Sequence, residues 1–241
     1  MCELQLAKAL GVLKAFSFVR EDKGHGFDMH RLVQLVTRKW LVNKGITCHF
    51  ATRAISTVSY NYPYGDHEHQ ATCGAYLAHA YVALELEGTG SRDEGLAKAV
   101  LLHRAAGYFV YHGQCKAAEG FLLQATKVRT ELLGGEHPNT LTSMSNLASR
   151  YWDQGRWKEA ESLMVQVKNS RKRVLGEEHS NTLTSMSILA FTWHSQGRVD
   201  ESLRLMEQCV QLRQRVLGLD HPDTMVSSSW LREWKEASAP I

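Results

Sequence analysis

The stretch that decides the fold runs from Leu175 to Met186 and reads LGEEHSNTLTSM. Forty-two residues earlier, residues 133–144 read LGGEHPNTLTSM, and forty-two residues later, residues 217–225 read LGLDHPDTM. A loop that recurs three times at a constant interval indicates a repeat architecture, and this takes priority over any local pattern. The interval also aligns other positions, so the period covers at least residues 99–225.

Each period predicts two helices. The first is expected over residues 139–155, NTLTSMSNLASRYWDQG, because Asn139 and Thr140 are helix-capping residues and Gly155 suits the left-handed end of a helix. Its apolar residues recur at three- and four-residue spacing and so form one stripe. The predicted core stripe is Leu141, Met144, Leu147, Ala148 and Tyr151.

The second helix is expected over residues 157–175 and ends at Gly176. Three cations, Arg171, Lys172 and Arg173, are expected to complement the helix dipole in its last turns. The small residues Ala148 and Ala160 should let the two helices approach closely. The predicted stripe of this helix is Trp157, Ala160, Met164, Val167 and Val174 or Leu175.

A single hairpin of this kind cannot bury its apolar face alone, so identical hairpins are expected to stack. The pattern of Leu147, Ala148, Tyr151 and Ala160 resembles the tetratricopeptide repeat. The 42-residue period and the LGEEHPxT-like joint resemble the kinesin-light-chain subtype of that repeat. The resemblance covers roughly the last 140 residues. It implies a mostly α protein in which residues 99–241 form a right-handed solenoid of about three hairpins and a terminal helix.

The first 45 residues follow a different pattern. A helix is expected over residues 4–14, a β-hairpin over residues 15–29 and a second helix from Leu32 to Trp40, an order that resembles a winged-helix unit. The stretch 27–41, FDMHRLVQLVTRKWL, resembles the end of the NB-ARC module of STAND-class, NLR-like ATPases, of which many fungal members carry kinesin-light-chain-type repeats directly afterwards. The resemblance implies that His30 senses a bound ADP.

The phosphate-binding loop of such an ATPase, G-x-x-x-x-G-K-[S/T], does not occur in the 241 residues. The chain by itself is therefore expected to be no enzyme and to need no cofactor, although a parent protein could be an ATPase. Between the two parts, residues 46–98 are expected to form an irregular helical connector.

Composition bounds the remaining function classes. The net charge of +3 is too small to argue for a nucleic-acid partner, although a winged helix leaves DNA binding open as an alternative. No apolar run reaches the ~20 residues that span a bilayer, so no membrane partner is expected. Five scattered cysteines without a signal peptide predict reduced thiols and a cytoplasmic location.

Two histidine patterns have a metal interpretation and a structural one. His67, Glu68, His69 and Cys73 have ligand-like spacing, with a solvated loop as the alternative. The histidines of the joints would lie about 10 Å apart in stacked hairpins, too far for one metal, so we expect each to make a structural hydrogen bond. The joint histidines are His137, His179 and His221.

The first helices of stacked hairpins are expected to line an inner groove. Large aromatic residues on that face are preferred binding anchors. By resemblance to peptide-binding tetratricopeptide domains, Asn146 would bond the backbone of a ligand, since an amide both donates and accepts; the alternative is a solvated helix residue. The predicted groove residues are Arg104, Tyr111, Asn146, Ser149, Trp152, Asp153, Ile188, Phe191 and His194.

The expected function is protein–protein recognition: a peptide or protein ligand binds in the groove and biases an NB-ARC ATPase module, in cis or in trans. The alternative is a stand-alone cargo adaptor similar to a kinesin light chain. Heptads near the N-terminus would favour the adaptor, and the sequence shows no heptad pattern there.

Overall fold

The computed structural model describes residues 19–21, 27–65 and 67–238. It divides the chain into two compact units, which are described separately below. One contains residues 1–54 and 86–89, and the other contains residues 55–85 and 90–241. The border therefore falls within a helix of the expected connector, and most of the connector belongs to the same unit as the repeats.

In the first unit, strands β1 (Val19–Glu21) and β2 (Phe27–Met29) pair antiparallel, with Val19 opposite Met29. Helix α2 (Arg31–Asn43) follows directly. The returning strand and the second helix expected from the sequence are confirmed. The helix expected over residues 4–14 lies outside the described residues, so the winged-helix assignment stays a prediction.

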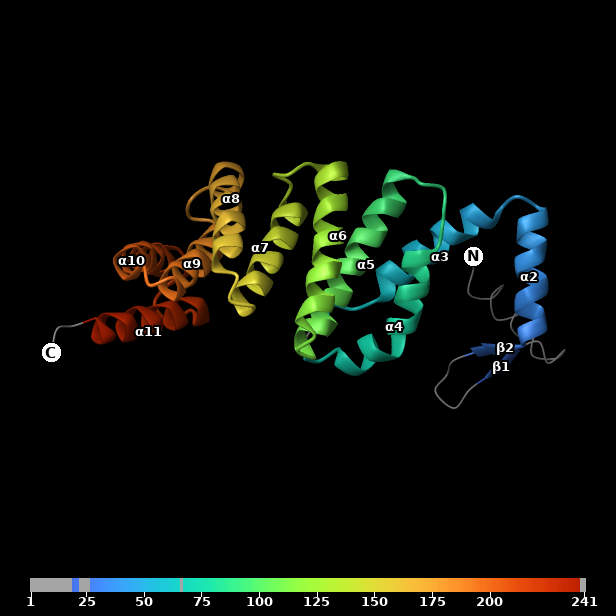
Figure 1. Ribbon diagram of the computed structural model, residues 1–241, viewed down its shortest axis with the longest axis horizontal. Helices are drawn as coiled ribbons and strands as arrows, with labels where there is room; N and C mark the ends of the chain where they lie inside the picture. The colour runs from blue at the N-terminus through green and yellow to red at the C-terminus, as the bar shows by residue number, and fades with distance from the viewer. Residues whose placement is uncertain (1–18, 22–26, 66, 239–241) are drawn as a thin grey trace. The chain divides into compact units, whose positions relative to one another are not determined.

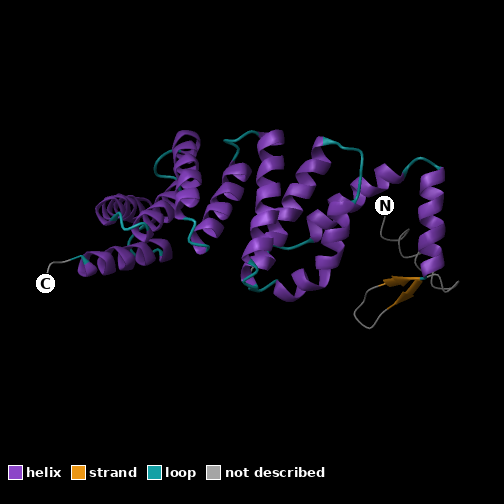
Figure 2. Cartoon of the chain, in the orientation of Figure 1, coloured by secondary structure: helices purple, strands orange, loops and turns teal. Residues whose placement is uncertain are grey.

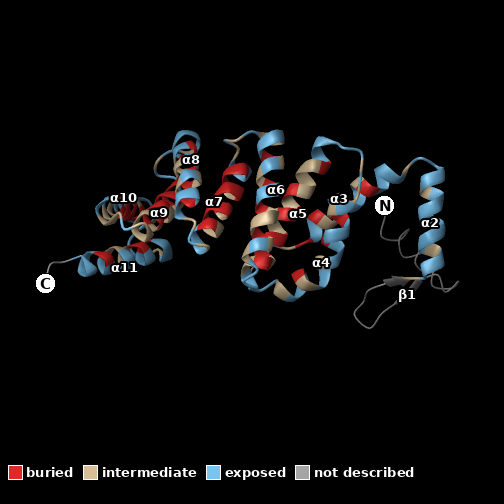
Figure 3. Ribbon diagram, in the orientation of Figure 1, coloured by how far each residue is buried: buried red, intermediate tan, exposed pale blue. Residues whose placement is uncertain are grey.

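Helix α2 contains no buried residue. Its apolar stripe, from Leu32 through Leu35 and Val36 to Trp40, is at least half exposed along its length (Figure 3). Such a stripe is typical of a helix that packs against another surface.

The second unit is helical in its described residues, and from α4 onward helices that follow one another in sequence pack side by side (Figures 1 and 2). Three helical hairpins and a last single helix repeat with the predicted period, and the connector is helical as expected, since α3 and α4 lie within residues 46–98. The helices are α3 (Thr47–Asn61, which begins in the first unit), α4 (Gln70–Glu85), α5 (Arg92–Tyr111), α6 (Cys115–Leu133), α7 (Pro138–Asp153), α8 (Trp157–Leu175), α9 (Ser180–Ser195), α10 (Val199–Leu217) and α11 (Pro222–Ala237).

The core runs from hairpin to hairpin. Leu147 and Tyr151 of α7 pack with Ala160 of α8, and the same cluster includes Ala106 and Leu122 of the preceding hairpin. Ala148 belongs to the next cluster along, with Leu183 and Leu189 among other buried residues of α9 and α10. Each hairpin therefore covers its neighbour, as the repeat predicted.

The joint histidines make the structural hydrogen bonds that were expected. His137, His179 and His221 are the N-caps of α7, α9 and α11, and each imidazole Nδ1 accepts a hydrogen bond from the backbone N–H two residues on, at 3.1–3.2 Å. The ring thus satisfies one of the donors that a helix start leaves without a partner.

Arg171 corrects a prediction. It is buried, and it donates to the carbonyl of Asn181 and to Ser185 Oγ at 3.0 and 2.7 Å, so it joins α8 to the next hairpin. Arg129 and Arg213 make the equivalent pairs of bonds one repeat before and one repeat after. Arg171 was expected to complement the dipole of its own helix, but it bonds across the joint.

Trp157 and Val174 also depart from the predicted stripe. They are 40% and 46% exposed, whereas Ala160, Met164 and Val167 between them are fully buried. The two outliers lie at the ends of α8, beyond the reach of the neighbouring hairpin.

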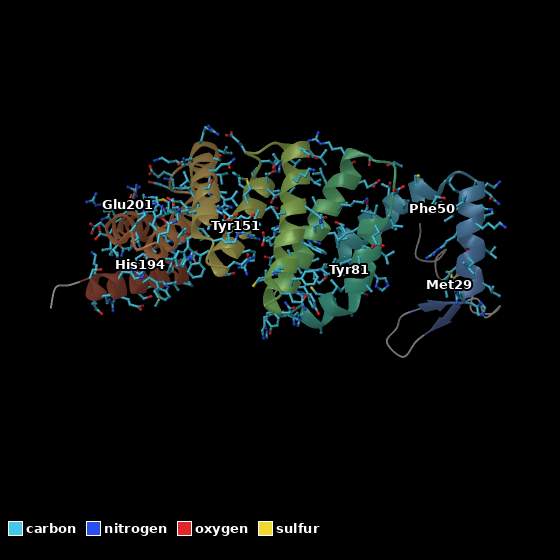
Figure 4. All side chains as sticks on the ribbon, viewed as in Figure 1. Met29, Phe50, Tyr81, Tyr151, His194 and Glu201 are labelled. Carbon is cyan, nitrogen blue, oxygen red and sulfur yellow. The ribbon has the colours of Figure 1, made fainter. Side chains whose placement is uncertain are left out.

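A second repeated network lies at the turns inside the α7–α8 and α9–α10 hairpins. Arg156 pairs with Glu119 of the preceding hairpin and with Glu159, at 2.7 and 2.5 Å. Arg198 pairs in the same way with Glu161 and Glu201, forty-two residues on (Figure 4). Burial raises the pKa of Glu119, but hydrogen bonds from Arg156 and Gln154 outweigh burial and hold the pKa below its ordinary value.

Candidate functional site

The main cavity of the predicted groove lies between α7 and α9 and has a volume of about 320 Å³. Five residues of the predicted groove line it, three from α7 and two from α9. They are Ser149, Trp152, Asp153, Ile188 and Phe191.

The polar groups at this cavity already have partners. The indole N–H of Trp152 donates to Ser195 Oγ at 3.0 Å, and the Ser195 hydroxyl donates to the carbonyl of Phe191 at 3.0 Å. Asp153 pairs with Arg150 at 2.7 Å, and the Ser149 hydroxyl donates to a carbonyl of its own helix. The walls therefore offer a ligand mostly the apolar faces of Trp152, Ile188 and Phe191.

A smaller cavity of about 110 Å³ lies over α5 and α7, and Ser149 lines both cavities. The side-chain amide of Asn146 also lines it and has no hydrogen-bond partner among the described residues. An unpartnered, half-buried amide has both a donor and an acceptor to offer a ligand. The remaining lining residues are Tyr64, His103, Ala106, Gly107, Val110, Leu122 and Arg150.

His103 is held neutral. Burial, and then the positive charges of Arg129 and Arg104, lower the pKa of its imidazole from 6.5 to about 4. Arg129 donates to Ser143 Oγ at 2.6 Å, and Ser143 Oγ lies 3.3 Å from His103 Nδ1. Because an arginine only donates, the hydroxyl proton is available for Nδ1, which leaves the other ring nitrogen, Nε2, as an N–H donor.

Arg104 does not face the groove as predicted. Its guanidinium donates to the carbonyls of Ser59, Tyr60 and Tyr62 at 2.9, 3.3 and 2.8 Å. The last carbonyls of a helix have no partner within the helix, and a long arginine on α5 reaches those at the end of α3.

Tyr111 and His194 are also placed differently from the prediction. Tyr111 is 51% exposed, lines neither cavity and meets the ring of His67 edge to face. His194 stacks on Trp234 of α11 at 4.2 Å, so it supports the last helix (Figure 4). Phe191 has both roles, since it lines the larger cavity and also packs on Trp230 and Trp234.

Sequence reasoning missed Tyr64, Trp230 and Trp234. Tyr64 belongs to a loop outside the repeat, so no periodic signal marks it. Trp230 aligns with Ile188 by the 42-residue period, and this alignment could have shown that α11 brings large rings to the same face.

His30 is exposed and is the N-cap of α2, where its Nδ1 accepts a hydrogen bond from the N–H of Leu32 at 3.3 Å. No described residue of this chain forms a nucleotide site around it. Its nucleotide-sensing role therefore stays a prediction.

Neither a metal cluster nor a membrane span is found in the part of the chain that the structure describes. No group of three or more His, Cys, Asp or Glu side chains is placed to hold a metal ion among these residues. None of the described helices is both long enough and apolar enough to cross a bilayer.

Residues 140–181 and 182–223 match the family model described as the tetratricopeptide repeat. The chain therefore carries at least two such repeats, which correspond to the hairpins of α7–α8 and α9–α10. Among solved structures, one described as a Podosopora anserina putative kinesin light chain with nearly identical TPR-like repeats has a TM-score of 0.61 and 24% identity, and the match covers 77% of this chain and 85% of that one. BtubC (BKLC) from P. vanneervenii has a TM-score of 0.57 and 18% identity, over 69% and 66% of the two chains.

One curated relative is similar to this chain in sequence. A protein of Hyaloscypha variabilis named "Nucleotide-binding leucine-rich repeat (NLR)-like protein" is 38% identical over 139 residues. The match covers 57% of this chain and 14% of that protein, so this chain corresponds to a small part of the relative.

Proposed function

We propose that the cavity between α7 and α9 binds a peptide or protein partner. The observation that supports this most directly is the cavity of about 320 Å³ between two tetratricopeptide repeats, lined by Trp152, Ile188 and Phe191. Tetratricopeptide repeats generally serve protein–protein interaction. Concave sites with mostly apolar walls and a few directed polar groups are typical of ligand binding.

Asn146 supports a polypeptide as the ligand. Its amide lies in the adjoining cavity without a partner among the described residues, and Ser149 belongs to the walls of both cavities. An extended chain that crosses α7 would place a side chain in the larger cavity and an amide of its backbone beside Asn146. An amide side chain matches a backbone amide because each has one donor group and one acceptor.

The wider role we propose is the recognition region of a STAND-class, NLR-like signalling protein. The likeness to a protein named NLR-like supports this setting. The exposed apolar stripe of α2 is the surface on which an NB-ARC module would pack, in cis or in trans, and His30 would then approach its nucleotide. Binding in the groove would bias that ATPase between its two nucleotide states.

The second candidate is an adaptor similar to a kinesin light chain. It is favoured by the likeness in fold to a protein described as a putative kinesin light chain. The two candidates differ in the partner of α2. The NLR-like protein requires an ATPase module that packs on α2, and the adaptor does not require one.

Affinity capture from a fungal lysate tests the recognition function. The full chain is compared with Ser149→Arg, which puts a charge into the groove, and with Ser162→Arg, which puts the same charge on an exposed position of α8. A protein that the parent and the α8 variant retain and that a still-folded Ser149→Arg loses would support the groove. Equal capture by all three would contradict it.

A further inference from the structure

The structure contains three successive helix pairs at which the same groove position can be compared: α5 with α7, α7 with α9, and α9 with α11. Shifted back by forty-two residues, Ser149, Trp152, Ile188 and Phe191 become Gly107, Val110, Asn146 and Ser149. All four of these shifted residues line the smaller cavity. The two cavities are therefore the same site in two consecutive repeats.

At the last pair, the chain's own aromatic rings occupy this position. Phe191 stands where α7 has Ser149, and Trp234 stands where α9 has Thr192. The ring of Phe191 lies 5.4 Å from Trp230 and 5.1 Å from Trp234, edge to face in both cases, and Trp234 is only 4% exposed. Rings from two neighbouring helices thus contact one another where the preceding pair keeps its cavity.

At the first pair, α5 with α7, residues 62–65 of the chain itself lie on the equivalent groove position. A methyl group added to Gly107 would come within 3.1 Å of the backbone nitrogen of Gly65, so the segment lies directly on α5. Arg104, the equivalent of Asn146, holds carbonyls just before this segment and at its start, down to Tyr62 at 2.8 Å. The side chain of Tyr64 lines what remains of the cavity.

The middle pair has smaller residues at two positions where the last pair has rings, and no segment of the described chain lies over it. Ser149 and Ile188, which line the cavity of about 320 Å³, stand where the last pair has Phe191 and Trp230. We infer that this cavity takes an aromatic side chain from an extended segment of a partner polypeptide, with the adjoining backbone bonded to Asn146. The inference rests on the proposed recognition function and specifies its ligand.

The chemistry of the walls agrees with a ring. The indole N–H of Trp152 is already bonded to Ser195, so the indole offers its face and edge and no free donor. Phe191 already makes edge-to-face contacts on the side of α11. Aromatic pairs prefer edge-to-face or offset arrangements to face-to-face stacking, and a ligand ring would extend this row by one member.

A random heptapeptide library displayed on phage tests the inference with a defined probe. The full chain is panned in parallel with Ser149→Phe, which gives α7 the residue that α9 has at this position and should fill the cavity. Ser162→Phe, on the exposed side of α8, is the matched control. We expect the parent and the control to enrich peptides with Phe, Tyr or Trp at one common position, and Ser149→Phe to lower the recovery of these peptides by at least tenfold.

The outcomes separate the two proposals. Enrichment of aliphatic peptides that Ser149→Phe also blocks would overturn the aromatic inference and leave the groove as the binding site. Peptides that bind Ser149→Phe as well as the parent would contradict the groove itself. Trp152→Ala, which removes a wall without filling the cavity, provides the same comparison if Ser149→Phe does not fold.

Discussion

At the scale of the residue, the least expected feature is the buried arginine at each joint. Arg129, Arg171 and Arg213 are 5–6% exposed and bond only to carbonyls and hydroxyls among the described residues. Burial lowers the pKa of Arg171 from its ordinary value, because a charge in a poorly solvated site is unfavourable. A buried charge is costly unless it is hydrogen-bonded, so each bond at the joint matters for stability.

Arg171→Ala should therefore lower the free energy of unfolding by about 2–4 kcal/mol, because it removes the hydrogen bonds that the buried guanidinium donates to the carbonyls of Asn181 and Leu141 and to the Ser185 hydroxyl. Arg173→Ala is the control on the same helix. Arg173 is exposed and pairs with Glu136, so its loss should cost less than about 1 kcal/mol. Urea unfolding followed by circular dichroism measures both, and equal effects of the two changes would contradict the role assigned to Arg171.

His103 predicts a dependence of stability on pH. The pKa of its imidazole is about 4 in the folded chain and 6.5 as an unperturbed group, so the unfolded chain binds more protons between these values. The stability that its neutral form contributes is complete above pH 6.5 and is lost as the pH falls toward 4, by at most about 3 kcal/mol. The groups that face it are Arg129, Arg104, Ser143 and Tyr64.

The measurement is the urea midpoint of the parent and of His103→Gln between pH 4 and pH 7. The variant cannot take up the proton, so its stability should fall less over this range. Parallel pH profiles of the two proteins would show that His103 is not buried in the neutral form.

At the scale of the element, the helices could be predicted because the signals are local. Gly155 and the spacing of the apolar stripe lie within one hairpin, and the structure has the helix and its left-handed glycine end there. The expected capping residues were wrong: Asn139 and Thr140 lie inside α7, and His137 is its N-cap. Arg171 could not be placed in this way. A cation near a helix end can complement the dipole or bond to the next element, and one helix alone does not distinguish these uses. Only the three-fold recurrence of the arginine at the period pointed to the joint.

The cap of α9 gives an element-scale prediction. His179→Ala removes the acceptor of the Asn181 N–H and should cost about 1 kcal/mol. His179→Asn should cost only a few tenths of that, since asparagine is among the best N-cap residues and can accept the same bond. Thermal unfolding of the three proteins measures this. An asparagine variant as unstable as the alanine variant would mean that the ring contributes through contacts other than the cap.

At the scale of the whole molecule, the groove could be predicted only as far as the repeats are regular. The residues of α7 that line the cavity follow from the period and the stripe, and they were identified. The period assigned His194 and Arg104 to the groove, but both contact other parts of the chain. His194 stacks on Trp234, forty residues further along the chain, and Arg104 bonds a segment outside the repeat. Contacts of this kind, in which the chain itself occupies groove positions, cannot be seen from the pattern within one repeat.

The stacking of the repeats predicts how the loss of one contact spreads. Leu147 is buried in a cluster with Tyr151 and Ala160 of its own hairpin and with Ala106 and Leu122 of the preceding one. Leu147→Asp places a carboxylate there with no cation in the cluster, which should cost several kcal/mol. Because each hairpin depends on its neighbour, hydrogen-exchange protection should fall in α5 and α6 as well as in α7 and α8.

Hydrogen exchange followed by mass spectrometry measures this, with Ser162→Asp on the exposed side of α8 as the control. The control should leave protection unchanged in all four helices. Loss of protection confined to α7 would mean that the hairpins fold independently of one another, and the account of the core as a continuous stack would then be wrong. Loss that crosses the joint into α5 and α6 would show that this hairpin depends on its contacts with α7 for stability, as the continuous core implies.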